Sequence, residues 1–166
     1  MKTYYPRDNL LPTPEAMELW FTAIRDISYE TATAFLHKWI TTEKWAPTIA
    51  EIRSGCATVI SGEIPEWGDA WNDVTKAVRR YGYMQPEKAR KMMGELAWKA
   101  VDAIGGWQHF CESEDQMADR ANFRQCFEAF ARREQQDRVI PQQLKDTINN
   151  LRLGAAEKAL LPQEGT

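Results

Sequence analysis

The sequence is poor in the residues that build disulfide frameworks and metal sites. It has three cysteines, Cys56, Cys111 and Cys126, an odd number with no two of them in a CxxC pair. Its two histidines, His37 and His109, belong to no HExxH or similar ligand motif. We therefore expect no structural metal, and free cysteines that pack as small apolar side chains in a reducing compartment.

Long apolar runs, nucleotide-binding loops and an excess of basic charge are also absent from the sequence. No run of about 18 apolar residues occurs, so we expect no membrane-spanning helix. The nine glycines never fall into GxxxxGK(S/T) or GxGxxG, and no GxSxG motif is present. A formal net charge of −3 does not suit a general nucleic-acid binder. These absences predict a protein that is not an enzyme and holds no cofactor.

Helical signals dominate what the sequence does contain. Apolar residues recur at steps of three and four between proline, glycine and Ser/Thr caps, and no stretch alternates like a strand. Seven tryptophans and six phenylalanines supply enough apolar area for a sizeable core. We predict an all-α protein, a compact bundle of six or seven helices with a looser C-terminal helical segment. Residues 1–134 form the helical body, and the polar stretch 135–138 begins an amphipathic tail over residues 135–166.

Some helix ends can be assigned from capping residues. Thr48 and Glu51 fit a capping box, in which each side chain accepts a hydrogen bond from the other's backbone amide. Gly55 is expected to interrupt or end the helix that begins there. Ser113 and Gln116 fit a second capping box.

Five basic side chains come close together in the sequence at the junction of two predicted helices. Only Glu87 opposes them, so they form a local cationic cluster in an acidic chain. A solvated surface is the simplest interpretation, and the functional one is a contact site for DNA or for an acidic partner. The candidate residues are Arg79, Arg80, Lys88, Arg90 and Lys91.

The tail carries apolar residues at helical spacing after Pro141. An amphipathic helix of this kind can lay its apolar side into a groove on a partner, or it can pack on the protein's own core. The sequence leaves both arrangements open. The candidate contact residues are Leu144, Ile148, Leu151, Leu160 and Leu161.

One segment of the chain resembles a known family. Trp20 lies in a predicted helix, Ser28 begins the next one, and the string Trp-Ala-Pro-Thr-Ile-Ala-Glu-Ile-Arg follows over residues 45–53. This order is similar to the N-terminal domain of phage loader-and-inhibitor proteins of the replicative helicase, over residues 14–60. The same residues also suit helix capping and core packing, so a purely structural use of them is the competing interpretation. The signature consists of Trp45, Pro47, Thr48, Ile49, Glu51, Ile52 and Arg53.

The resemblance implies a non-enzymatic protein of bacteriophage DNA replication. Its N-terminal part would meet other replication components, such as an origin-binding phage protein. Its C-terminal part would engage a hexameric replicative helicase in the cytoplasm of the bacterial host. The implied activity is control of helicase loading, with inhibition of the helicase's ATPase and unwinding. The alternative is a DNA-binding or structural interaction module of a phage that uses the basic residues 79–91.

Overall fold

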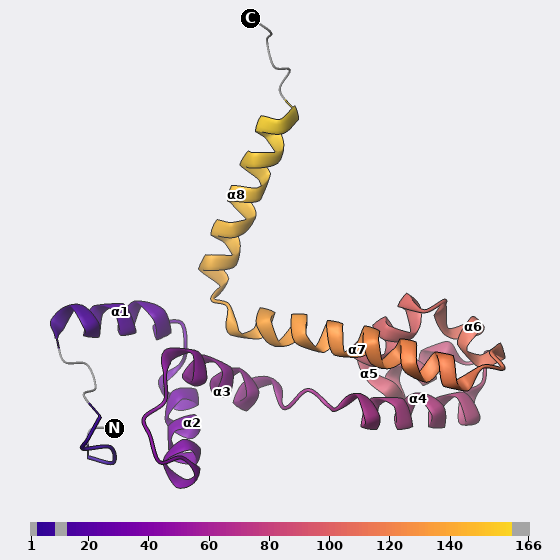
Figure 1. The fold of residues 1–166 in the computed structure, drawn as a ribbon, viewed down its shortest axis with the longest axis horizontal. Coiled ribbons are helices and arrows are strands. Elements are labelled where there is room, and N and C mark those ends of the chain that lie inside the picture. The colour runs from indigo at the N-terminus through magenta and orange to yellow at the C-terminus, as the bar shows by residue number, and fades with distance from the viewer. Residues whose placement is uncertain (1–2, 9–12, 161–166) are drawn as a thin grey trace, which may run out of the picture. The chain divides into compact units, whose positions relative to one another are not determined.

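All regular structure in the described part of the chain is helical (Figure 1). The computed structural model describes residues 3–8 and 13–160, with side chains described to residue 155. No strand occurs among these residues, which confirms the predicted all-α class. The helices are α1 (Pro14–Ile24), α2 (Tyr29–Thr42), α3 (Ile49–Ser61), α4 (Trp67–Tyr81), α5 (Pro86–Ala103), α6 (Gly106–Glu112), α7 (Gln116–Val139) and α8 (Gln142–Leu160).

The helices group into two compact units. The N-terminal unit comprises residues 1–62 together with 137–166, and the central unit comprises residues 63–136. These units differ from the division after residue 134 that the sequence suggests. Residues 135–138 contain neither proline nor glycine, so nothing in them breaks a helix, and α7 continues through them to Val139.

In the N-terminal unit, α2 and α3 approach each other closely at one aromatic ring. Phe35 of α2 is buried together with Ile52 and Cys56 of α3. Gly55 lies opposite the Phe35 ring, which occupies the space that a side chain would need. The prediction that Gly55 interrupts or ends its helix is therefore wrong, because this glycine serves close packing. The helix ends at Gly62, whose φ of 72° is one that glycine adopts readily.

The central unit is built around small residues that let α4 and α5 lie close together. Val74 and Ala77 of α4 and Ala89 and Ala100 of α5 have no exposed surface. Phe123 of α7 is also fully buried and completes this core. A core of this kind gives the central unit a fixed frame, because close-packed side chains leave little room for rearrangement.

Glycines give the central unit two features that the apolar spacing does not reveal. Gly94 has φ 80° and ψ 165°, so α5 consists of two helical segments joined by a kink. A turn at Gly105, with φ 120°, leads into the short α6, and the described residues thus contain eight helices where six or seven were expected. Trp107 of α6 is buried, and its indole N–H donates to the carbonyl of Gly82 at 3.0 Å.

The start of α7 also differs from the prediction. Asp115 Oδ1 accepts a hydrogen bond from the backbone N–H of Ala118 at 3.0 Å, so Asp115 caps this helix. The predicted capping box of Ser113 and Gln116 is wrong. An ionised carboxylate is a strong acceptor at the positive end of a helix, and Asp115 stands directly before the first helical residue.

Candidate interaction surfaces

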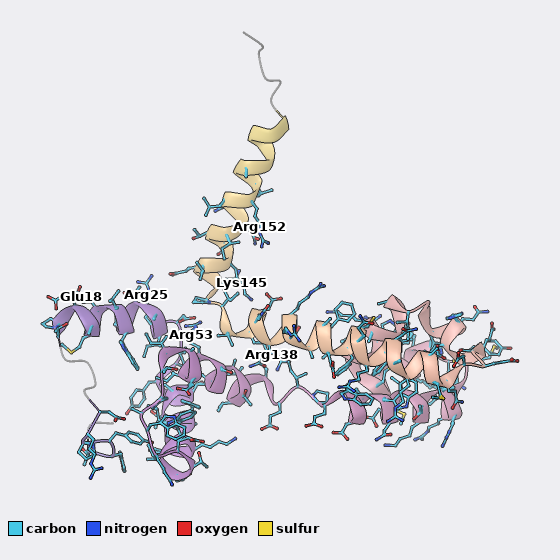
Figure 2. The ribbon with its side chains drawn as sticks, in the orientation of Figure 1. Glu18, Arg25, Arg53, Arg138, Lys145 and Arg152 are labelled. Atoms are coloured by element: carbon cyan, nitrogen blue, oxygen red, sulfur yellow. The ribbon has the colours of Figure 1, made fainter. Side chains whose placement is uncertain are left out.

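Arg53 of α3 joins three parts of the N-terminal unit (Figure 2). Its guanidinium makes a two-point ion pair with Asp26, Nη1 to Oδ1 at 2.7 Å and Nη2 to Oδ2 at 2.8 Å. Nη1 also donates to the carbonyl of Ala23 in α1 at 2.6 Å, and Nε donates to the carbonyl of Val139 at the end of α7 at 2.7 Å. A planar fork of donors is needed to reach three acceptors at once, and only arginine provides it.

The start of α8 is held by further arginine contacts within the same unit. Arg25 Nη2 donates to Oε1 of Gln143, in the first turn of α8, at 2.8 Å. Arg138 Nη1 donates to the carbonyl of Gly62 at 3.1 Å. Together with the Arg53 contact to Val139, these bonds attach residues 138–143 to α1 and α3. The start of α8 is therefore attached to the other helices of the N-terminal unit by specific hydrogen bonds.

The ion pair shifts the pKa values of both partners. Hydrogen bonding from Arg53 lowers the pKa of the Asp26 carboxyl, and the smaller effect of burial opposes this. Hydrogen bonding to Asp26 raises the pKa of Arg53. The folded N-terminal unit thus favours the charged form of both side chains.

We expect the Arg53–Asp26 pair to make the N-terminal unit sensitive to acid. A carboxyl whose pKa is lowered by folding stabilises the fold above its unfolded pKa, about 3.9, and that contribution is lost as pH falls through the lower folded value. Thermal melts from about pH 5 to pH 2 should therefore show a larger loss of stability for the wild type than for Asp26→Asn, which lacks the titrating group. Parallel losses in the two proteins would contradict this role of Asp26.

Most of the signature residues have local structural roles. Thr48 Oγ1 accepts from the backbone N–H of Glu51 at 3.3 Å, and the Glu51 carboxylate accepts from the N–H of Thr48 at 2.7 Å. This confirms the predicted capping box at the start of α3. Pro47 and Ile52 are buried, and Ile49 is partly buried. These five residues are accounted for by helix initiation and packing.

Trp45 is the exposed member of the signature. Its side chain is 55% exposed, while its backbone carbonyl accepts the indole N–H of Trp39 at 2.9 Å. On the same unit, Leu19 and Phe21 of α1 are 70% and 67% exposed. Leu19 and Phe21 are two residues apart on α1, so they face different sides of that helix.

Helix α8 carries an apolar stripe that the described residues leave uncovered. Leu144, Ile148 and Leu151 follow one another at steps of four and three, so they share one face of the helix. Leu144 is 48% exposed, Leu151 is 68% exposed and Ile148 is partly buried. The side chain of Leu160 and the whole of Leu161 lie outside the described residues. Both arrangements that the sequence left open therefore stay predictions.

Two basic residues each follow a stripe leucine by one position, so they lie beside the stripe on one side of α8. Lys145 and Arg152 are two helical turns apart, next to the stripe, and no hydrogen bond or ion pair joins either side chain to another described residue. Leu153 is also 68% exposed but lies roughly 160° around the helix axis from Leu151.

No described helix, α8 included, is long and apolar enough to cross a lipid bilayer.

Of the five basic residues at 79–91, Arg90 is paired with a carboxylate, whereas the other four have exposed side chains. Arg90 forms a two-point ion pair with Glu95 across the kink of α5, with N–O distances of 2.8 Å and 2.6 Å, and its guanidinium lies over the Trp98 ring. The charge of Arg90 is thus largely compensated. The side chains left exposed are those of Arg79, Arg80, Lys88 and Lys91.

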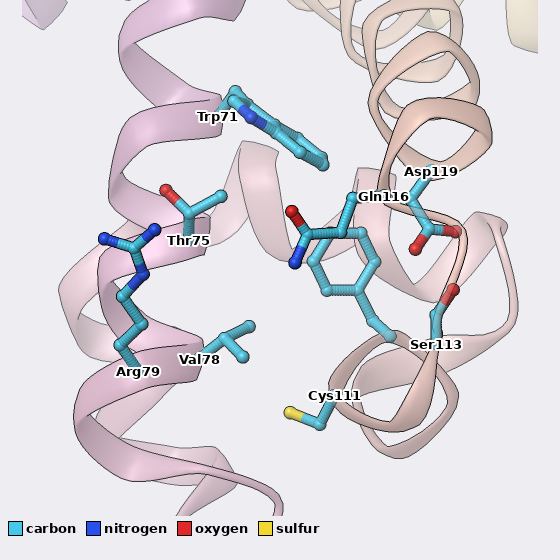
Figure 3. A pocket seen from close by; sticks show the side chains of 9 residues that line it. Trp71, Thr75, Val78, Arg79, Cys111, Ser113, Gln116 and Asp119 are labelled. Atoms are coloured by element: carbon cyan, nitrogen blue, oxygen red, sulfur yellow. The ribbon is translucent and has the colours of Figure 1, made fainter.

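A small pocket opens in the central unit between α4, α6 and the start of α7 (Figure 3). Its volume is about 100 Å³. The lining residues come from α4 and, about thirty residues later, from α6, the start of α7 and the turn between them, so no local spacing pattern indicates the pocket. Arg79 is the one of them that the sequence marked as a candidate contact residue. The apolar wall consists of Trp71, Val78 and Phe110, and the polar rim includes Arg79, Gln116 and Asp119.

The described residues hold no cluster typical of a metal site or an activated nucleophile. No group of three or more His, Cys, Asp or Glu side chains among them could hold a metal ion. His37 and His109 are both exposed. Burial raises the pKa of the Cys56 and Cys111 thiols, whereas a reactive cysteine needs a lowered pKa.

Among known proteins, a family match is found for the first part of the chain. Residues 1–53 match the family model for the N-terminal domain of the phage gene 39 protein. The match covers about a third of the chain, includes the signature and ends at Arg53, and it confirms the predicted resemblance for this segment. No curated protein and no solved structure matches the chain. The central unit and α8 lie outside the matched residues.

Proposed function

We propose, from the premise that residues 1–53 form a domain of the phage gene 39 protein type, that this protein acts in bacteriophage DNA replication. It binds a hexameric replicative helicase in the cytoplasm of the host cell, controls its loading, and keeps its ATPase and unwinding activity inhibited until then. The observation that carries the proposal is the family match, which includes the signature through Arg53. The protein itself is not an enzyme in this proposal, and it acts through binding energy.

The helicase contact is assigned to the uncovered stripe of α8. Full burial of a large apolar side chain contributes about 1.5–3 kcal/mol, so Leu144, Ile148 and Leu151 together supply a contact energy of several kcal/mol before the costs of association. Lys145 and Arg152 border the stripe, which suits a groove whose edge carries carboxylates. A ligand that binds one conformation of the helicase more tightly than the others holds it in that conformation, which is sufficient for inhibition.

The N-terminal unit is assigned a second contact. Trp45, Leu19 and Phe21 are its exposed large apolar side chains, and the partner in this proposal is an origin-binding phage protein. The arginine contacts at the start of α8 link the two functions physically. A helicase bound to α8 is carried by the same unit that meets the origin complex.

The test compares two leucines of equal exposure on opposite sides of α8. Leu151→Asp places a charge in the stripe, and Leu153→Asp places the same charge on the other face of α8. Each wild-type leucine is 68% exposed, so the two substitutions are matched in burial. We expect Leu151→Asp to weaken helicase binding at least about tenfold, a loss of about 1.4 kcal/mol, and Leu153→Asp to leave it unchanged. Binding is measured by calorimetry with the purified host and phage helicases, and inhibition by their ATPase rates.

Two results would count against the proposal, and they are distinguishable. If both aspartate variants bind and inhibit as the wild type does, the stripe is not the contact. If the wild-type protein binds neither helicase and changes neither ATPase rate, the proposed function itself is wrong.

A further inference from the structure

We propose that the end of the α4–α5 hairpin in the central unit is a contact site for single-stranded DNA. Its basic side chains are Arg80 of α4 and Lys88 and Lys91 of α5, and its aromatic side chain is Tyr83 in the turn between the two helices. These residues lie outside the family match. The choice of DNA rests on the proposed function, because a helicase is loaded onto a single strand and the protein that delivers it comes close to that strand.

The short turn places these side chains at one end of the hairpin. Residues 82–85 join α4 to α5, and Ala77 and Ala89, on either side of the turn, are both fully buried in the same core. Lys88 and Lys91 are three residues apart, so they lie on one side of α5, within about 8 Å of its start along the helix axis. The packed core therefore holds the two helix ends, and the cations on them, in a fixed arrangement.

The positive charges at this end of the hairpin are not neutralised by other described residues. No ion pair joins Arg80, Lys88 or Lys91 to a carboxylate of the described chain. Lys88 donates a hydrogen bond to the side-chain oxygen of Gln85 at 2.7 Å, but this amide is neutral and leaves the charge uncompensated. Glu87 is the only carboxylate in the segment 79–91. An excess of exposed cations of this kind attracts the phosphates of a nucleic acid.

Two basic residues of the same segment do not belong to the site. Arg90 is paired with Glu95. Arg79 lines the pocket that Asp119 also lines, so a carboxylate already shares its surroundings. Because only three cations remain, the contact is weak by itself. It becomes effective when a bound helicase keeps the strand nearby, which raises the local concentration of DNA.

The Tyr83 ring favours a single strand over other polyanions. Its side chain is 57% exposed and lies in the chain between the cation of α4 and the cations of α5. A base of a single strand can stack on an exposed aromatic ring, and this stacking does not depend on the sequence of the DNA. The bases of a duplex are already stacked on one another, and an acidic peptide of Asp and Glu has no ring to offer. Cations together with an exposed ring are typical of proteins that bind single strands of any sequence.

The experiment measures binding of the full-length protein to a fluorescein-labelled oligonucleotide of about twenty thymidines, by fluorescence anisotropy and without helicase. We expect a dissociation constant of about 1–100 μM at about 50 mM salt. Three cations on a single strand give a slope of about −2 when the logarithm of the affinity is plotted against the logarithm of the salt concentration. Binding should therefore weaken about twentyfold when the salt is raised to about 200 mM.

Two lysine variants give a matched test of the charge. Lys91→Gln and Lys99→Gln make the same change at two exposed lysines of α5, and only Lys91 belongs to the site. We expect Lys91→Gln to weaken binding at least about threefold at low salt and to reduce the steepness of the salt dependence by about 0.7. Lys99→Gln should change neither quantity. Both side chains are exposed, so both variants should fold, which circular dichroism reports.

Two tyrosine variants test the stacking. Tyr83 and Tyr29 are 57% and 85% exposed, and only Tyr83 belongs to the site. We expect Tyr83→Ala to weaken binding of the thymidine strand at least about fivefold and to leave binding of a duplex of the same length unchanged. Tyr29→Ala should affect neither ligand.

Four results would contradict the site. The oligonucleotide does not bind at low salt; Lys91→Gln and Lys99→Gln weaken binding equally, as in a diffuse charge effect; Tyr83→Ala binds the single strand as the wild type does; or poly-glutamate displaces the labelled strand as well as unlabelled thymidine strand of equal charge does, which assigns the surface to an acidic protein.

The helicase titration separates this site from the proposed function. If the wild-type protein binds DNA with the expected variant pattern but binds no helicase, the DNA site is supported and the proposed function is wrong. If it binds and inhibits a helicase but does not bind the strand, the DNA site alone is wrong.

Discussion

Gly55→Ala should destabilise the N-terminal unit, although alanine is the better helix former. A Cβ at residue 55 would overlap Cδ2 and Cε2 of Phe35 and lie 2.9 Å from its Cζ. The ring is only 5% exposed and cannot move aside without disturbing the small core around it. Overpacking of this kind costs up to about 3 kcal/mol, and the helix propensity of alanine returns about 1 kcal/mol, so we expect a net loss of about 2 kcal/mol.

Native-state hydrogen exchange measures this loss where it occurs. Amides of α2 and α3 should exchange about 30-fold faster in Gly55→Ala, while amides of α4 and α5 in the central unit should be unaffected. Gly154→Ala is the matched control, because Gly154 is also helical and a Cβ there meets nothing within 4 Å. The double variant Phe35→Leu/Gly55→Ala should recover part of the loss. Unchanged exchange in Gly55→Ala would show that the Phe35 ring is not packed as described.

Arg53→Met should release residues 137–143 from α1 and α3 of the N-terminal unit. The substitution keeps much of the apolar side-chain volume but removes the ion pair with Asp26 and the bonds to the carbonyls of Ala23 and Val139. The Arg53 side chain is 11% exposed, so the carbonyls it satisfies lose their partner in a partly buried place. Because Asp26 is 43% exposed and water can replace part of the pairing, we expect a loss of about 2 kcal/mol rather than the larger cost of a fully buried pair.

Two further variants separate the charge of Arg53 from its shape. Arg53→Lys retains the charge but cannot reach all three acceptors, so it should lose more than half of the stability that Arg53→Met loses. Asp26→Asn leaves the two carbonyl contacts in place and should cost less than either. Hydrogen exchange at Val139 and in the first turn of α8 is the measurement. If Arg53→Lys is as stable as the wild type, charge alone holds this junction together.

The helices were predictable where short-range chemistry decides them. The capping box of Thr48 and Glu51 needs only residues three apart, and the all-α class follows from apolar spacing within single helices. Gly55 shows where that reasoning stops. Its helix-ending role was inferred from residue type, whereas the reason for a glycine there is Phe35, twenty residues earlier in the sequence. The kink of α5 at Gly94 and the separate helix α6 were not predicted. Both depend on glycines with positive φ, and the spacing of apolar residues along the sequence does not show where a glycine adopts that conformation.

The candidate surfaces were predictable to different degrees. The stripe of α8 follows from spacing, but its exposure depends on whether other helices cover it, which the sequence cannot show. The partners of Arg53 lie in α1, after α1 and at the end of α7, so no local pattern relates them. The pocket beside Arg79 combines side chains of α4 with side chains of α6 and the start of α7, so residues close in sequence do not predict it.

The path of the chain has a consequence for how its parts can be exchanged. The central unit lies between two segments of the N-terminal unit: the polypeptide leaves that unit after residue 62 and returns to it at residue 137. The bond between Arg138 and the Gly62 carbonyl, at 3.1 Å, shows that the exit and the re-entry are neighbours. A segment whose two ends are neighbours can be inserted or removed without disturbing the structure of the unit that carries it. The middle of this chain could therefore be exchanged without moving either flank of the N-terminal unit.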